Sequence, residues 1–314
     1  MKQTLSILLL LLWTLVACIN EDLSECSVAA RISFSFSTQA ELAANDTLYD
    51  VRLYIVDNEG TIVRTLTYDY VEGNKEYALE VDIPPGVYHL VVWSSHAHPY
   101  EVNFSNPATR ATAWEEKLKE KIFSLAVPSS QQVNQEIPRL FYGQLYNVSL
   151  SATADITLRI PMEEKTNTIH LTVTGLPTDA AQNYELSIAD DNGAYHFTGE
   201  LAPDDDFSYV STLVPITAKA DTLYTRLRVL HLADDRSPLV SLRNTVNGEL
   251  MYPVHDSHEP DLTELIKEAY KDVDAFAFDR QHIFHLSIHF HADMSVSIGI
   301  EQWDDQPTET DLLS

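Results

Sequence analysis

Residues 51–68, VRLYIVDNEGTIVRTLTY, indicate the fold class of this chain. Apolar and polar residues alternate on both sides of DNEG at 57–60, and a period of two is typical of half-buried β-strands. Asp, Asn and Gly between two such runs favour a tight turn, because glycine adopts a positive φ without strain. The stretch therefore predicts a β-hairpin.

Similar runs lie on either side of this hairpin. RISFSFS at 31–37 places Ile32, Phe34 and Phe36 on one face, as a half-buried strand requires. YALEVDIPPGVYHLVVW at 77–93 supplies two more alternating runs, which bend at the sequence PPG. Short strands separated by turn residues predict an all-β fold.

The pattern then recurs further along the chain. NTIHLTVTGL at 167–176 matches the first strand, with Ile169 at the place of Ile32, and YELSIADDNG at 184–193 matches VRLYIVDNEG, with Leu186 at the place of Leu53. These offsets, 137 and 133 residues, indicate a duplication and hence two β-sandwich domains in tandem. The expected division is a signal peptide at 1–17, an acidic linker at 18–30, an N-terminal domain at 31–157, a C-terminal domain at 158–303 and an acidic tail at 304–314.

Two segments have helical periodicity instead. TAWEEKLKEKIF at 112–123 repeats Trp114, Leu118 and Ile122 at four-residue spacing, which predicts an amphipathic helix. DLTELIKEAY at 261–270 begins with Asp261 and Glu264 in the spacing of a capping box. We therefore expect a few short helices among the strands.

The first eighteen residues, MKQTLSILLLLLWTLVAC, have the layout of a secretory signal: one basic residue, an apolar run too short to span a bilayer, and small residues before Cys18. LVAC resembles the lipobox of bacterial lipoproteins, which implies cleavage between Ala17 and Cys18 and acylation of the cysteine. An ordinary signal followed by a free thiol is the alternative. Glu21 and Asp22 resemble the signal that exports some lipoproteins to the outer face of the outer membrane.

The net charge and the number of cysteines limit the kinds of partner that the chain can bind. The formal net charge is −27, and removal of residues 1–17 takes away Lys2, which leaves −28. This charge repels phosphate groups and argues against nucleic acid as a partner. With Cys18 acylated, Cys26 has no second cysteine in the chain, so it is either a free thiol or a site of intermolecular pairing.

A histidine-rich strand is the feature of the sequence that most strongly suggests a metal site. In HIFHLSIHFH at 282–291, alternation places His289 and His291 on the polar face, roughly 7 Å apart in an extended strand. They could share a cation with a third ligand from a neighbouring strand, but zinc usually needs three or four ligands. We favour a half-exposed strand, with apolar residues on one face and polar residues on the other: Phe284, Leu286, Ile288 and Phe290 against His285, Ser287, His289 and His291.

Known catalytic motifs are missing from the sequence. It has no GxSxG, no Gly-rich phosphate loop and no CxxC. The aspartate-rich segments DDNG at 190–193 and DDD at 204–206 do not belong to a calcium-binding loop, which has its glycine at position six and its glutamate at position twelve. Both segments are typical of turns. We therefore expect no catalytic residues and no cofactor. Asp-Thr-Leu at Thr47 and at Thr222 resembles an acceptor for bacterial O-glycosylation.

Several motifs in succession resemble one family. The lipobox cysteine, EDLSEC at 21–26, IPPGVYHLVVW at 83–93, RLFYGQLYNV at 139–148 and SVSIGIEQW at 295–303 are together similar to the FimB-type minor fimbrial anchor subunits of the Bacteroidetes fimbrillin superfamily. The resemblance implies two transthyretin-like β-sandwich domains and an outer-membrane lipid anchor. It also implies fimbrillin partners and a role in anchoring a pilus, ending its assembly and contributing to adhesion, without enzyme activity.

Two other functions stay open at this point. A fimbrial tip or shaft subunit would act as an adhesin through aromatic-lined loops, and the fifteen tyrosines of the chain could line them. A surface metal-dependent hydrolase would use the histidine strand. Shaft subunits of the family are thought to be cut after a basic residue, and Arg31 is the basic residue that directly precedes the expected first strand. We expect the chain to keep this strand and its lipid.

Overall fold

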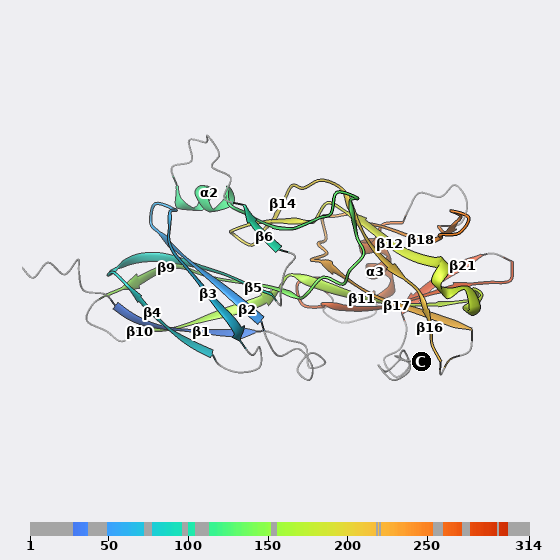
Figure 1. The fold of residues 1–314 in the computed structure, drawn as a ribbon, viewed down its shortest axis with the longest axis horizontal. Coiled ribbons are helices and arrows are strands. Elements are labelled where there is room, and N and C mark those ends of the chain that lie inside the picture. The colour runs from blue at the N-terminus through green and yellow to red at the C-terminus, as the bar shows by residue number, and fades with distance from the viewer. Residues whose placement is uncertain are drawn as a thin grey trace, which may run out of the picture.

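The computed structural model describes residues 28–36, 49–71, 77–95, 100–103, 113–151, 156–217, 219, 221–253, 260–271, 277–293 and 295–300. Strands dominate it, and the two halves of the chain lie side by side (Figure 1). The prediction of an all-β sandwich fold with few short helices is confirmed. In chain order, the first ten strands of the described residues are β1 (Val28–Phe36), β2 (Tyr49–Asp57), β3 (Ile62–Val71), β4 (Tyr77–Ile83), β5 (Gly86–Ser95), β6 (Tyr100–Asn103), β7 (Ile122–Leu125), β8 (Gln132–Val133), β9 (Leu140–Leu150) and β10 (Ile156–Glu164).

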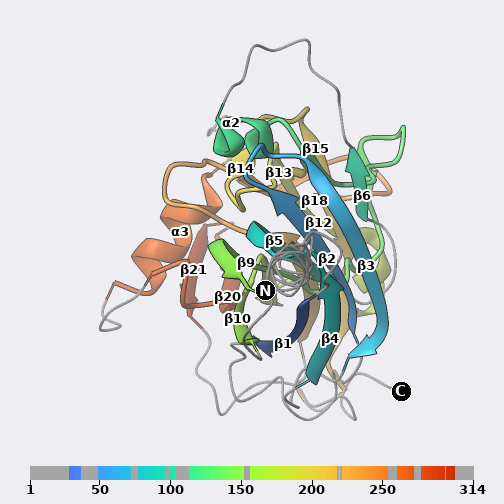
Figure 2. The same cartoon turned by 90° about the vertical axis from the view of Figure 1, so that its left-hand side faces the viewer.

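Seven of these strands form one sheet in the order β3-β2-β5-β9-β10-β1-β4. The sheet curls, so its two edge strands β3 and β4 approach each other (Figure 2). The guanidinium of Arg64 on β3 donates to the carbonyl of Asp82 on β4. One face of the curled sheet encloses a cluster of buried apolar side chains contributed by every strand except β3. Its fully buried members include Ile32, Leu53, Leu90, Phe141 and Ile160.

The predicted hairpin is confirmed in β2 and β3. Asp57 closes the turn, because its Oδ1 accepts from the backbone N–H groups of Glu59 and Thr61, both at 2.9 Å. Gly60 lies at φ +78°, a conformation that a residue with a side chain rarely adopts. The hairpin then places alternate residues of β2 in the core, with Leu53 and Ile55 fully buried.

The C-terminal half is a sandwich of two five-stranded sheets, β16-β17-β11-β20-β21 and β19-β18-β12-β15-β8. The alternating apolar residues of the facing strands fill the space between them, among them Ile169, Leu186 and Phe284. Its strands are β11 (Thr166–Thr174), β12 (Tyr184–Asp190), β13 (Ala194–His196), β14 (Leu201–Ala202), β15 (Phe207–Thr212), β16 (Val214–Pro215), β17 (Thr222–Leu230), β18 (Leu239–Asn244), β19 (Leu250–Tyr252), β20 (Ile283–Phe290) and β21 (Val296–Ile300).

Strand pairing repeats between the halves. β1 lies between β10, which is parallel to it, and β4, which is antiparallel. β11 lies in the same way between parallel β20 and antiparallel β17. β2 pairs with β3 and β5, and β12 pairs with β15 and β18, all antiparallel. The equivalences read from the sequence, β1 with β11 and β2 with β12, therefore occupy equivalent places in the two halves.

The expected boundaries need correction. The boundary between 157 and 158 falls inside β10, and β10 stays in the N-terminal sheet because it pairs with β1 and β9. β1 begins at Val28, three residues before the expected start. β8 pairs with β15 of the C-terminal half, and β6 and β7 form a four-stranded sheet with β13 and β14. Neither half is therefore contiguous in sequence.

The first helix is shorter than its periodicity predicts. α2 covers only Trp114–Lys119, and Ile122 lies in β7 instead. β7 pairs with β6 on one side and β13 on the other, so backbone pairing with distant strands overrides the local helical pattern. Within the described ranges the other helices are η3 (Thr178–Asn183) and α3 (Leu262–Ala269). The predicted cap of α3 is confirmed, since Asp261 accepts from Thr263 N at 2.8 Å.

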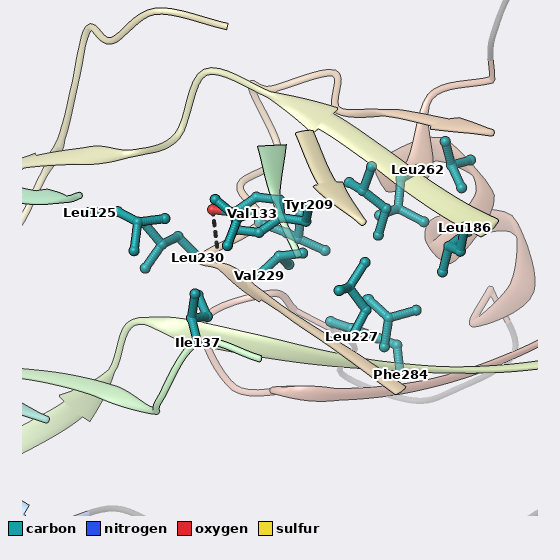
Figure 3. Packing of buried hydrophobic residues seen from close by; sticks show 14 of the residues in the cluster. Leu125, Val133, Ile137, Leu186, Tyr209, Leu227, Val229, Leu230, Leu262 and Phe284 are labelled. Carbon is teal, nitrogen blue, oxygen red and sulfur yellow. Dashed lines mark hydrogen bonds between the residues drawn. The ribbon is translucent and has the colours of Figure 1, made fainter. Parts of the chain in front are cut away.

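A second buried cluster runs through both halves. It joins residues of the N-terminal sheet, such as Trp93 and Tyr142, to the interior of the C-terminal sandwich. Figure 3 shows Leu125, Val133 and Ile137, from the segment that precedes β9, close to Leu230 and Tyr209 of the C-terminal half. The Tyr209 hydroxyl also accepts from the N–H of Leu230 at 3.2 Å. This second cluster is therefore continuous between the two halves, whereas the first lies within the N-terminal sheet alone.

Candidate functional sites: the histidine strand, an acidic hollow, the joint and the sheet edges

The histidine strand has the predicted apolar face. Phe284, Leu286, Ile288 and Phe290 are all buried. The polar face differs from the prediction at His285, which is only 6% exposed and stacks on His170 of the neighbouring strand with ring centroids 4.7 Å apart. Burial, together with His285 and two nearby arginines, lowers the pKa of His170 to about 3. His170 is therefore a neutral ring at physiological pH.

His289 and His291 lie at the exposed end of this strand. Their rings are 4.4 Å apart. His289 Nδ1 hydrogen-bonds Thr174 Oγ1 at 2.6 Å, and His291 Nε2 hydrogen-bonds Ser297 Oγ at 3.0 Å. Among the described residues no group of three or more His, Cys, Asp or Glu side chains could hold a metal ion. In the described part of the chain the pair is a surface feature held by these hydrogen bonds.

Replacing His289 and His291 together with threonine should leave stability nearly unchanged. Both side chains are exposed, and exposed strand positions usually tolerate β-formers within about 0.5 kcal/mol. Urea unfolding of the variant and the wild type measures the difference, and metal analysis of the purified proteins provides the control. Equimolar zinc in the wild type that is lost in the variant would contradict this expectation.

An acidic hollow of about 480 Å³ opens where three loops of the C-terminal half meet. Arg236 lies in it and pairs with Asp191, whose carboxylate and carbonyl oxygens each lie 3.0 Å from Nη2. Asp190 is 8% exposed, and burial raises the pKa of its carboxyl to about 6. Asn192 is part of the core and not of a cation loop, because its amide bonds Tyr209 and Leu230. These contacts make the segment structural.

Asp190 should make stability depend on pH. Its folded pKa lies above the unfolded value near 3.9, so the folded state binds this proton more tightly. Protonated Asp190 therefore adds to the free energy of unfolding below about pH 4. This contribution, about 3 kcal/mol, is lost as pH rises through 6. Asparagine does not titrate, so the free energy of unfolding of Asp190→Asn should rise by about 3 kcal/mol relative to that of the wild type between pH 4 and pH 7. Urea unfolding at both pH values measures this difference. A difference that does not change with pH would contradict the assignment.

The chain passes from β10 into β11 of the C-terminal half through a single residue, Lys165, and we call this place the joint. Lys165 N donates to Leu140 O at 2.7 Å, and the Tyr195 hydroxyl donates to Lys165 O at 3.1 Å. Beside it Arg139 and Glu164 form a two-pronged ion pair, with Arg139 Nε 2.8 Å from Oε1 and Nη2 on Oε2. Both side chains are only 2% exposed. The joint is therefore fixed by buried polar contacts.

The sheet edges are the other surfaces suited to binding another chain, because an edge strand offers unpaired backbone groups to an added strand. Within the described residues the longest edge strands are β3, with ten residues, and β4, with seven. Val63 on β3 is 51% exposed, which is unusual for a large apolar side chain in this half. The edges of the C-terminal sheets are at most five residues long.

The residues of the expected lipid signal lie outside the described part of the chain: Ala17, Cys18, Glu21, Asp22 and Cys26. Thr47 does so as well. Thr222 is described and is only 7% exposed, so its hydroxyl is not accessible to a glycosylating enzyme in this fold. None of the helices in the described ranges is long and apolar enough to cross a membrane.

Sequence reasoning missed the joint. Arg139 and Glu164 are 25 positions apart, and no periodicity links them. The available signal was weak: a charged residue directly beside an apolar strand, in PRLFYG at 138–143 and in MEEKTN at 162–167. A buried position for either charge requires a partner, and only the pairing of β9 with β10 brings the partner near.

Two halves with repeated strand pairing and a core cluster that extends through both define an all-β sandwich protein. A family model described as fimbrillin-A associated anchor proteins Mfa1 and Mfa2 matches residues 23–306. The chain belongs to this family and is a fimbrial subunit that associates with the cell surface and with other fimbrial subunits.

Solved structures with the same fold come from species of Bacteroides and Porphyromonas. A candidate polysaccharide-binding protein of Bacteroides thetaiotaomicron is 19% identical, with a TM-score of 0.68 over 89% of this chain and 100% of that one. The fimbrial anchor protein Mfa2 of Porphyromonas gingivalis is also 19% identical, with a TM-score of 0.60 over 88% of this chain and 98% of that one. No curated protein sequence matches the chain. At these identities the structures show a shared fold.

Proposed function

We propose that this fimbrial subunit is an outer-membrane lipoprotein, exposed at the cell surface, which anchors a fimbria through acylated Cys18 and ends its assembly. Membership of the anchor family and the lipobox-like LVAC at 15–18 support this function. Adhesion then follows from holding the fimbria on the cell. The partners are fimbrillin subunits on one side and the membrane lipid on the other.

The position of Arg31 is the observation that carries the proposal. A shaft subunit must lose its first strand, so that a neighbour's strand can take its place. Here Arg31 lies inside β1, where it is paired with Thr157 of β10 and with Glu80 of β4. A protease needs a locally extended, unpaired backbone, and this backbone is held on both sides. Arg31 is therefore protected from proteolysis, and β1 remains covalently joined to the acylated Cys18.

The next basic residue gives no better site. Arg52 lies within β2, between Thr67 of β3 and Trp93 of β5. Removal of β1 would also expose Ile32 and Phe34, which are 0% and 1% exposed. A chain that keeps β1 has no vacant groove at this place, so it fits the end of a polymer better than its repeating unit. A partner strand would then join at a free sheet edge and not in a groove left by β1.

Intact-mass measurement on protein taken from assembled fimbriae tests this function. We expect the dominant species to begin at acylated Cys18, because both internal arginines are protected by pairing. Reduced and carboxymethylated protein provides the control for modification at Cys26. A dominant species that begins at Ile32 or Leu53 would contradict the anchor function and favour a shaft subunit.

A further inference from the structure

The strand nearest the N-terminus is held along its length. β1 and β10 run parallel in seven register pairs, from Ala30 opposite Ile156 to Phe36 opposite Met162. Ser33 Oγ adds a contact across this ladder by donating to Leu158 O at 3.1 Å. On its other side β1 has seven antiparallel pairs with β4. β1 is therefore an interior strand at the place where the chain enters the fold.

The direction of the ladder determines how a pulling force reaches it. Because β1 and β10 are parallel, the N-terminal end of β1 and the C-terminal end of β10 lie at opposite ends of the ladder. β10 continues through Lys165 into β11 and the C-terminal half. A force between the N-terminus and the C-terminal half therefore pulls the two strands in opposite directions along their common axis. This is shear, which loads all hydrogen bonds of the ladder together.

Buried contacts hold both ends of the path along which the force passes from β1 to β10. At the start, Ala30, Ile32 and Phe34 are at most 1% exposed, so sliding β1 would also pull three side chains out of the core. At the far end, the buried Arg139–Glu164 pair and the bond from Lys165 N to Leu140 O hold the end of β10. The load thus passes from β1 into the sheet and from the sheet into the joint.

We propose that the chain is a tension-bearing link, in which the parallel ladder of β1 and β10 acts as a shear clamp between the N-terminal attachment and the C-terminal half. The site at which force enters rests on the proposed lipid anchor. The clamp itself rests on the strand pairing. A fimbria pulled by a flowing medium would load it in the direction in which it resists most.

Single-molecule force spectroscopy can test the clamp by changing only the pulling direction. Both proteins carry an N-terminal tag as one handle, with Cys18 and Cys26 replaced by serine. The shear protein adds Glu163→Cys, whose side chain is 71% exposed in the native residue, near the end of β10. The matched control adds Pro84→Cys instead, one residue after Ile83, which pairs with Val28 at the entry end of β1. In the control the force opens the antiparallel ladder between β1 and the edge strand β4 one pair at a time and does not shear β1 against β10.

We expect the N-terminal half to rupture at a force at least about twofold higher in the shear protein than in the control, because forced unfolding follows the barrier along the pulled direction. Equal thermal midpoints of the two proteins would show that the difference comes from direction and not from stability. Equal rupture forces would overturn the clamp. The measurement needs no lipid, so failure of the lipid anchor would appear in membrane fractionation and not here.

Discussion

Replacing Arg139 with methionine is expected to lower the free energy of unfolding by about 3–5 kcal/mol, because it leaves a buried carboxylate without its counter-charge. The Glu164 side chain is 2% exposed and would keep the hydroxyl of Thr166 as a donor, at 2.8 Å from Oε1. Methionine retains the apolar part of the arginine side chain, so most of the loss comes from the charge. Guanidinium chloride unfolding of the variant and the wild type measures it.

Two further variants make the result specific. The double variant Arg139→Met with Glu164→Leu should recover much of the loss, since apolar replacement of a buried pair is often close to neutral. Lys267→Met breaks a surface pair with Glu264, in which the two side chains are 32% and 68% exposed, and should cost less than about 1 kcal/mol. A loss below 1 kcal/mol for Arg139→Met would mean that the pair does not hold the joint.

The second large effect concerns the proposed anchor, because Cys18→Ala is expected to release the protein from the membrane. Several acyl chains at about 0.8 kcal/mol per buried methylene give effectively permanent attachment, and alanine offers no thiol for acylation. The variant should move from the outer-membrane fraction to the soluble fraction and lose incorporation of labelled fatty acid. Fimbriae should then be shed with it.

Cys26→Ala provides the matched control, since it removes a thiol eight residues further along the same segment. This variant should stay in the outer membrane and keep its fatty acid. If Cys18→Ala still sediments with outer membranes and resists a salt wash, the lipid anchor is wrong. The folded domains would be unaffected in either case, because the described sheets begin at Val28.

Local patterns predicted much of the fold. The hairpin of β2 and β3 follows from alternation on both sides of a turn, in which Asp57 can bond two backbone N–H groups and Gly60 can take a positive φ. The cap of α3 follows from the position of Asp261. The duplication was also visible, because equivalent strands keep the same alternation. Each of these signals depends on residues that are close together in the chain, so it can be read from the sequence directly.

Other features depend on which strands become neighbours. Ile122 has helical spacing from Leu118 but lies in β7, since β6 and β13 offer backbone partners there. His285 was expected to be half-exposed on the polar face, yet it is buried against His170 because β11 and β20 pair in parallel. Alternation tells which face a side chain occupies, but it does not tell what covers that face.

The sequence by itself therefore determined the all-β class, the repeated first strands, the turn at 57–60 and the charge that repels nucleic acid. Only the tertiary structure decided where the halves divide, how Arg139 finds Glu164 and that Arg31 is paired on both sides. The physical reason is the range of the interactions. Turns, caps and alternation depend on neighbouring residues, whereas strand partners 25 to 125 positions apart are brought together by burial of the shared core.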